Sequence, residues 1–235
     1  MAGHIKGRFK WKMFKLGLIQ FGLMYIFYIS AFQYLEAHQI AVLTILTPFY
    51  VLLFNFIFEF KLRPLSFTVA FLNIFVSGWL VYKDGVGQFL GIMLMQISNM
   101  CFAFGQVYYK KIRDRIEGTD SEIFFWPYLS ATLLAGGSFA IFGDIDKIAM
   151  TPTQWAVMIY LGLVATGLGF FLWNKGAKKT SIGNLAISNN LKIPLAIMFA
   201  FVFLGEQIDW IKILIYFTLF SGSIALLKSD KEKFY

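Results

Sequence analysis

The sequence is poor in charge, cysteine, histidine and proline. Only 14% of its 235 residues are Asp, Glu, Lys or Arg, whereas a soluble domain carries about 25%. Hydrophobic residues reach 58%, which excludes an ordinary soluble domain. The single cysteine, Cys101, excludes a framework of intramolecular disulfides.

Groups that perform catalysis are also scarce. His4 lies in a basic leader and His38 in an expected loop, and almost no carboxylate interrupts the apolar runs. An intramembrane protease or a metalloenzyme would need paired carboxylates or a cluster of histidines. We therefore expect no enzyme activity, no metal site and no cofactor.

The chain is instead rich in apolar sequence, with a mean hydropathy of +0.67. The apolar residues form continuous blocks of roughly 17–25 residues, long enough to cross about 30 Å of hydrocarbon at about 1.5 Å per residue. A membrane β-barrel would show alternation over segments of about ten residues. The sequence therefore predicts an all-α, polytopic helical membrane protein in the lipid bilayer. About eight transmembrane helices are expected, at residues 16–35, 40–58, 66–82, 87–109, 123–142, 155–174, 184–204 and 210–227.

The basic residues indicate how the chain crosses the membrane, because Lys and Arg accumulate on the cytoplasmic side. Seventeen of the 21 basic residues lie in the N-terminal segment, in alternate loops and in the C-terminal tail. This distribution predicts a multi-pass protein of the inner or plasma membrane with both termini in the cytoplasm. It also accounts for the net charge of +8 without a nucleic-acid partner. Lys192 is the one basic residue deep inside an expected span.

Polar residues inside four of the expected spans fall on one face of their helix at helical spacing. An unpaired polar group in hydrocarbon is costly, so each face needs partners. Hydrogen bonding between helices is one explanation for each face. Four such faces together favour a water-accessible central cavity. The faces consist of Gln88, Gln96, Asn99 and Gln106; of Thr44, Thr47 and Asn55; of Gly162, Thr166, Gly169 and Trp173; and of Ser188, Asn189 and Lys192.

The stretch ISNNLKIPLA, residues 187–196, places two amides, an ammonium and a proline within six residues of one span. An ionisable residue inside a membrane indicates a functional site, although Lys192 could instead extend to an interface about 12 Å away. Pro194 cannot donate to the carbonyl of Asn190, so we expect a free backbone acceptor beside the lysine, with a simple packing kink as the alternative. Interrupted helices of this kind hold substrate in membrane carriers, and an ammonium suits a carboxylate.

These patterns define a candidate site for a small-molecule substrate. Lys192 is expected to hold an anionic group, the amides to orient the polar parts of the substrate, and two threonines to line the opposing wall. Two aromatic residues complete the set, although an aromatic stripe is also typical of helix packing. The candidate substrate-binding residues are Lys192, Asn189, Asn190, Asn99, Gln96, Thr44, Thr47, Trp173 and Tyr25, and the candidate helix breaks are Pro194 and Pro48.

Two segments of the chain resemble each other. Residues 34–62 and 177–208 each contain a short polar turn, a span with a central proline, and a glutamate eleven or twelve residues after that proline. The expected topology places these glutamates, Glu59 and Glu206, on opposite sides of the membrane, where we interpret them as structural markers of the repeat ends. The chain is therefore expected to contain an inverted repeat, as some membrane carriers do.

Several motifs occur in the order and topology of a known family. They are YLEAHQIA at 34–41, TP at 47–48, TGLGFFLWNKGAKKTSIGNLA at 166–186 and GE at 205–206. On these residues the chain resembles the EamA-type domains of the drug/metabolite transporter (DMT) superfamily over nearly its whole length. The resemblance implies transport of small metabolites across the inner membrane, with a site between the two repeats near the midplane. The NNLKIPLA variant is similar to the branch that handles amino acids, carboxylates or amines.

The chain departs from that family in one respect. The family usually has ten spans in two repeats of five, whereas three spans precede the second repeat here. We therefore expect a 3 + 5 bundle whose first repeat lacks two helices. Either the chain is truncated, or its start is assigned at an internal methionine, or it completes its cavity as a homodimer or with a second chain. The expected regions are a basic leader (1–15), a partial first repeat (16–82), a second repeat (83–228) and a cytoplasmic tail (229–235).

Together these features predict a transporter of small organic solutes such as amino acids, carboxylates or amines, which works by alternating access. The alternative is a truncated, non-transporting membrane partner that needs another chain to complete its bundle.

Overall fold

The computed structural model is helical in every described element and has no strand in the described parts of the chain. Four of the described helices are long and apolar enough to cross a membrane, and three shorter apolar helices accompany them. The all-α prediction is confirmed, while the number of spans and the 3 + 5 division stay predictions. The structure describes residues 7–35, 39–40, 43–60, 64–81, 89–113, 115–143, 150–195, 198, 202 and 210–232. Of the residues singled out from the sequence, four lie outside these ranges: His4, His38, Gln88 and Glu206.

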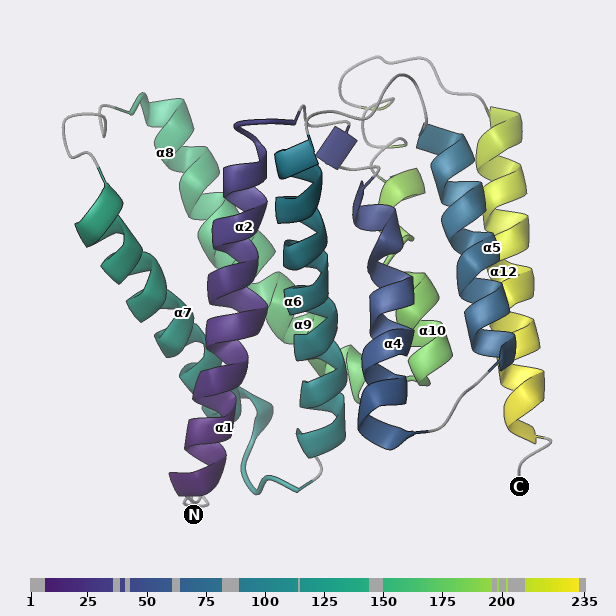
Figure 1. Cartoon of the computed structure of the whole chain (residues 1–235), viewed down its shortest axis with the longest axis horizontal. Helices are drawn as coiled ribbons and strands as arrows, with labels where there is room; N and C mark the ends of the chain where they lie inside the picture. Colours follow the sequence, from purple (N-terminus) through teal and green to yellow (C-terminus); the bar gives the residue numbers. More distant parts are fainter. Residues whose placement is uncertain are drawn as a thin grey trace. The chain divides into compact units, whose positions relative to one another are not determined.

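Several of the apolar runs fold as compound helices, in which an α-helical stretch passes into a π- or 3₁₀-helical one (Figure 1). The π-helical segments are η1 and η4, and the 3₁₀ turn is η2. The described elements are α1 (Gly7–Gly17), η1 (Leu18–Leu23), α2 (Met24–Ala31), η2 (Thr44–Leu46), α4 (Thr47–Glu59), α5 (Pro64–Val81), α6 (Phe89–Arg113), α7 (Asp120–Phe142), α8 (Pro152–Ile159), η4 (Tyr160–Leu168), α9 (Gly169–Ala177), α10 (Ile182–Ser188) and α12 (Trp210–Glu232).

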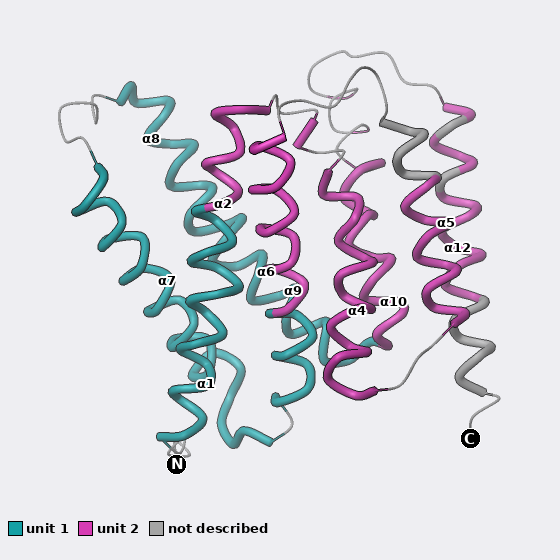
Figure 2. The backbone as a smooth tube through the Cα atoms, viewed as in Figure 1, with its two compact units in different colours: residues 1–26, 105–180 teal, residues 27–104, 181–235 magenta. Residues whose placement is uncertain are grey.

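The chain forms two compact units (Figure 2). Unit 1 comprises residues 1–26 and 105–180, and unit 2 comprises residues 27–104 and 181–235. Each of the two expected repeats therefore contributes helices to both units. The repeat boundaries themselves stay a prediction.

In unit 1, α1 and η1 pack along α7. Glycine makes this close approach feasible, because a Cβ at Gly17 would collide with the carbonyl oxygen of Pro127 and the hydroxyl of Ser130. A Cβ at Gly22 would meet the side chain of Leu134. The later glycine contacts the later residue of α7, so α7 runs in the same direction as α1 and η1. The core beside them consists of Met13, Leu16, Phe21, Tyr109, Ile112, Ile116, Ile123 and Phe124.

In unit 2, corresponding helices of the two expected repeats lie side by side. The helix α10 packs against α4, and α12 packs against α5 (Figure 1). Val69, Ile187 and Phe220 form one buried cluster among these helices. A second cluster consists of Ala31, Leu35, Ile40 and Met95.

A carboxylate joins three helix ends of unit 1. Asp120, the first residue of α7, accepts a hydrogen bond from Arg113 Nε at 2.6 Å and one from Lys178 Nζ at 2.7 Å. Tyr109 donates its hydroxyl to the same carboxylate at 3.3 Å. The side chain of Asp120 is only 9% exposed, so water screens these ion pairs weakly. The end of α6, the start of α7 and the end of α9 are thereby held together.

A third basic residue, Lys110, lies at this end of unit 1. Lys110 Nζ donates to the carbonyls of Ala177 at 3.1 Å and Thr180 at 2.5 Å, where α9 ends. Cations stabilise the C-terminus of a helix because its last carbonyls lack partners within the helix. The two basic segments after α6 and α9 therefore lie at the same end of unit 1.

Replacing Asp120 by Ala should lower the free energy of unfolding by about 2–3 kcal/mol, because two largely buried cations lose their counter-charge. Thermal unfolding in detergent micelles measures the change. Glu117→Ala is the matched control, because Glu117 lies in the loop just before α7 and is exposed. Equal melting temperatures for the two variants would show that the carboxylate does not hold these helix ends together.

Candidate functional site

Four of the predicted site residues meet in unit 2, between the η2–α4 segment and α6. Asn99 Nδ2 donates to the carbonyl of Leu43 at 2.9 Å and lies 3.4 Å from Gln96 Oε1. Tyr50 donates its hydroxyl to the same Gln96 oxygen at 3.0 Å. Thr47 donates to the Thr44 carbonyl at 2.6 Å and lies 3.5 Å from Asn99 Oδ1.

The carbonyl of Leu43 determines the orientation of both amides. A carbonyl can only accept, so the group of Asn99 that faces it must be the NH₂. The Gln96 atom that faces this NH₂ and the Tyr50 hydroxyl is then the oxygen. The remaining group, Gln96 Nε2, is buried and has no hydrogen-bond partner within the described part of the chain. Both hydrogen bonds of the Asn99 NH₂ are therefore made within the protein, whereas the Gln96 NH₂ has no hydrogen-bond partner among the described residues.

Asn190 joins two interrupted helices of unit 2. Its Nδ2 donates to the carbonyl of Ile45 at 3.1 Å and to Oδ1 of Asn73 at 3.0 Å. Ile45 is the middle residue of η2, the 3₁₀ turn that precedes α4. Pro48, the second residue of α4, follows this turn directly, and such an early helical position suits proline because its missing N–H would have no intrahelical partner.

The second interruption lies at residues 189–191, between α10 and the helical turn at 192–195. Pro194 is buried there and supplies no N–H. The expectation of a free carbonyl at Asn190 is nevertheless wrong. The N–H of Ile193 donates to this carbonyl at 3.1 Å, because the backbone tightens into a bond over three residues.

Asn189 and Lys192 occupy different surroundings. Asn189 is 3% exposed and donates to the carbonyl of Leu185 at 2.9 Å, one turn back along its own helix. Lys192 is exposed and makes no hydrogen bond or ion pair with the described residues. The two residues differ in exposure, and the common face that the sequence predicted for them stays a prediction.

The two predicted aromatic residues belong to unit 1. Tyr25 and Thr166 are hydrogen-bonded through their hydroxyl groups at 2.8 Å. Trp173 is half-buried, and its indole Nε1 has no partner among the described residues. The predicted site residues therefore divide into two sets, one in each unit.

Several buried or half-buried polar residues lie outside the polar faces that the sequence predicted. In the sequence each of them is an individual amide or tyrosine in an apolar span and belongs to none of the predicted polar faces. In unit 1, Gln20 Nε2 donates to Asn174 Oδ1 at 3.3 Å, and Tyr128 donates to the carbonyl of Gly167 at 2.5 Å in η4. The missed residues are Gln20, Tyr50, Asn73, Tyr128 and Asn174.

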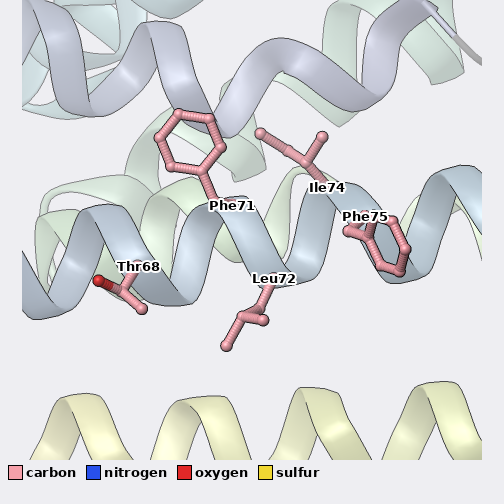
Figure 3. Close-up of a pocket in the computed structure, with 5 residues that line it drawn as sticks. All are labelled: Thr68, Phe71, Leu72, Ile74 and Phe75. Atoms are coloured by element: carbon pink, nitrogen blue, oxygen red, sulfur yellow. The ribbon is translucent and has the colours of Figure 1, made fainter.

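A recess of about 570 Å³ lies along α5 in unit 2 (Figure 3). Its walls are apolar except for Thr68, whose hydroxyl already donates to the carbonyl of Pro64 at 3.1 Å. The recess therefore offers no free polar group that could recognise a polar solute. It is lined by Thr68, Phe71, Leu72, Ile74 and Phe75.

Replacing Asn190 by Ala should lower the free energy of unfolding by about 1–3 kcal/mol, because two buried acceptors lose their donor. Thermal unfolding in micelles measures this. Asn184→Ala is the matched control on α10, since Asn184 Oδ1 already has no partner among the described residues. A loss no larger than the control's would mean that Asn190 does not hold the two interruptions together.

Comparison with known proteins places these features in a family. Residues 89–228 match the EamA-like transporter family. The biotin transporter of Salmonella typhimurium (strain LT2) is 32% identical over 197 residues, which are 83% of this chain and 66% of the relative. The biotin transporter of Escherichia coli (strain K12) is 31% identical over 216 residues, 91% of this chain and 70% of the relative. The probable biotin transporter of Pseudomonas aeruginosa is 30% identical over 208 residues, which are 87% of this chain and 73% of the relative.

The chain thus spans about two thirds of the length of the Salmonella relative. A crystal structure of another protein matches 95% of this chain and 78% of its own, with a TM-score of 0.76 and 16% identity, which shows a shared fold alone. The family consists of transporters, so the prediction that the chain is not an enzyme is confirmed. With its apolar helices, the chain is a multi-pass membrane protein. It belongs to the EamA-like transporter family, which confirms the resemblance drawn from its sequence motifs.

Proposed function

We propose that the chain is a carrier that moves a small, carboxylate-bearing organic solute across the inner membrane by alternating access. Its membership of a transporter family supports the activity. The single observation that carries the substrate class is Lys192, an ammonium in an apolar segment that has no ion pair among the described residues. A cation without a counter-charge is costly in a membrane and is best neutralised by an anionic ligand.

Biotin is the first substrate to test, because the relatives carry the name biotin transporter. Biotin has a carboxylate on a flexible chain and a ureido ring whose carbonyl accepts hydrogen bonds. Lys192 suits the carboxylate, and the unpartnered Nε2 of Gln96 suits a carbonyl acceptor. In this proposal Asn99 and Thr47 do not bind substrate but hold Gln96 and the wall around it.

The membrane topology belongs to the same proposal. Eight spans in a 3 + 5 arrangement would place both termini in the cytoplasm, with the three shorter apolar helices counted among the spans. The basic segments after α6 and α9 support this topology, because they lie at the same end of unit 1. Lys and Arg gather on the cytoplasmic side of membrane proteins.

The Lys192→Ala variant should lose saturable uptake, with kcat/KM at least about tenfold lower, because a charge-assisted bond to the solute is lost. Uptake of radiolabelled biotin into proteoliposomes measures it, with membrane insertion checked in the same preparation. Lys192→Arg should retain part of the uptake. Lys179→Ala should not change it, because Lys179 is exposed beyond the end of α9. Normal uptake by Lys192→Ala would refute the role of the lysine.

The Gln96→Met variant should raise the KM for biotin about tenfold, because methionine has a similar shape but cannot donate. Tyr50→Phe is the control, since it removes the bond to Gln96 Oε1 and leaves the Nε2 donor in place. Its KM should stay close to that of the unaltered chain. If both variants raise KM equally, Gln96 acts through packing and not as a ligand donor. Absence of saturable uptake by the unaltered chain would favour the non-transporting alternative.

A further inference from the structure

Several basic residues at the ends of α6 and α9 have partners inside unit 1. Arg113 and Lys178 pair with Asp120, and Lys110 donates to the carbonyls where α9 ends. The positive charge of these three side chains is therefore compensated by groups of the protein itself.

The basic residues of α1 are different. Arg8, Lys12 and Lys15 form no ion pair and no hydrogen bond with the described residues. The helix α1 contains no acidic residue, and the sequence has no Asp or Glu before Glu36. Like charges three or four residues apart on a helix repel each other and destabilise it. An anion from outside the described chain would relieve this repulsion.

The three cations share one face of α1 with a tryptophan. At 3.6 residues per turn, the four side chains fall within about 100° of the helix circumference. Trp11 is 57% exposed, Arg8 and Lys15 are exposed, and Lys12 is half-buried. The other side of the helix, which includes Met13, is buried in the core of unit 1. We call Arg8, Trp11, Lys12 and Lys15 the basic face of α1.

Aromatic rings position two of the ammonium groups. Lys15 Nζ lies 5.5 Å from the centroid of the Trp11 ring, and this ring stacks on Phe14 with centroids 5.3 Å apart. Lys12 Nζ lies 5.6 Å from the centroid of the Phe9 ring. The face of an aromatic ring attracts a cation but carries no net charge. The rings therefore order the lysines and leave the positive charge of the face in place.

The position of α1 in the chain places this face at a membrane surface. Together α1, η1 and α2 form one helix, Gly7–Ala31, that is long and apolar enough to cross a membrane. Its charged residues all precede Leu16, and residues 16–31 contain none. The basic face therefore lies at the end of a span, where hydrocarbon meets the lipid headgroups. Tryptophan is enriched at this boundary, which agrees with the exposure of Trp11.

We propose that the basic face of α1 binds the phosphate headgroup of an anionic phospholipid. Basic residues beside a membrane span attract anionic lipids, and guanidinium and ammonium groups form charge-assisted hydrogen bonds with phosphate. Trp11 then contacts the ester end of the acyl chains. A zwitterionic headgroup fits less well, because it brings a cation of its own to three others. The proposal requires only that the helix Gly7–Ala31 crosses a membrane, so it does not depend on transport of any solute.

The test uses the whole chain in vesicles of equal parts phosphatidylcholine and phosphatidylglycerol. In each preparation one of the two lipids is brominated near the headgroup end of its acyl chains, because bromine quenches tryptophan fluorescence on contact. The chain has six tryptophans, so the contribution of Trp11 is the difference between the unaltered chain and Trp11→Phe. We expect brominated phosphatidylglycerol to quench this contribution more strongly, with a relative affinity of about tenfold over phosphatidylcholine.

The variant Arg8→Gln/Lys12→Gln/Lys15→Gln should lose this preference, so that the two brominated lipids quench Trp11 equally. A second variant, Arg8→Lys/Lys12→Arg/Lys15→Arg, keeps the charge of the face and should keep the preference. It also shows whether the first variant fails for lack of charge or because its side chains were altered.

The matched control removes the same charge elsewhere in unit 1. Arg115→Gln/Lys175→Gln/Lys179→Gln alters three exposed basic residues outside α1 and should leave the preference of Trp11 within about twofold of the unaltered chain. An equal loss in this control would overturn the proposal, and so would equal quenching by the two lipids in the unaltered chain. Inorganic phosphate, added at constant ionic strength, should not compete. If it abolished the preference, the face would bind a soluble anion and the lipid proposal would be wrong.

Discussion

The packing of the two interrupted helices in unit 2 depends on hydrogen bonds from the side-chain amide of Asn190. In a membrane every backbone carbonyl needs a partner within the protein, so a helix can be interrupted only where other groups replace the lost bonds. Asn190 donates to the carbonyl of Ile45 in one interrupted helix, while its own carbonyl accepts from Ile193 in the other. The same short segment therefore breaks one helix beside Pro194 and stabilises the break in the other.

The same requirement distinguishes amides whose NH₂ groups bond to backbone carbonyls from side chains whose donors have no partner among the described residues. Asn99 and Asn190 direct their NH₂ groups to backbone carbonyls, which makes them part of the scaffold. Gln96 receives two hydrogen bonds on its oxygen and keeps its nitrogen donor, and Lys192 keeps its charge. In the proposed site, this donor and this cation suit a solute that has acceptors at both ends.

Unit 1 is stabilised by close backbone approach and by charge at one end. Gly17 and Gly22 allow α7 to lie against α1 and η1, and Asp120 neutralises the basic residues where three helix ends meet. The same glycine spacing recurs at Gly162 and Gly167, since LGLIQFGL at 16–23 is matched by LGLVATGL at 161–168. Among the described helices, one packs closely on the glycines of the first copy, and none packs in the same way on those of the second.

Hydropathy and periodicity predicted the helices, the prolines predicted the interruptions at Pro48 and Pro194, and the resemblance of several motifs indicated the family. These features depend on residues within one segment, and the cost of polar groups in hydrocarbon makes them visible there. The sequence also indicated that Thr44, Thr47, Gln96 and Asn99 belong together. It could not assign donors to acceptors, because Asn190 and its partner Ile45 are 145 residues apart. Only the tertiary structure decided that the Asn190 carbonyl is satisfied, that Asn189 is buried and Lys192 exposed, and that one glycine pair is covered and its repeat is open. The Asn190 carbonyl is satisfied within its own segment, by the N–H of Ile193, because the backbone tightens where the helix is interrupted. The other outcomes depend on which distant segments pack together, and no local pattern specifies that packing.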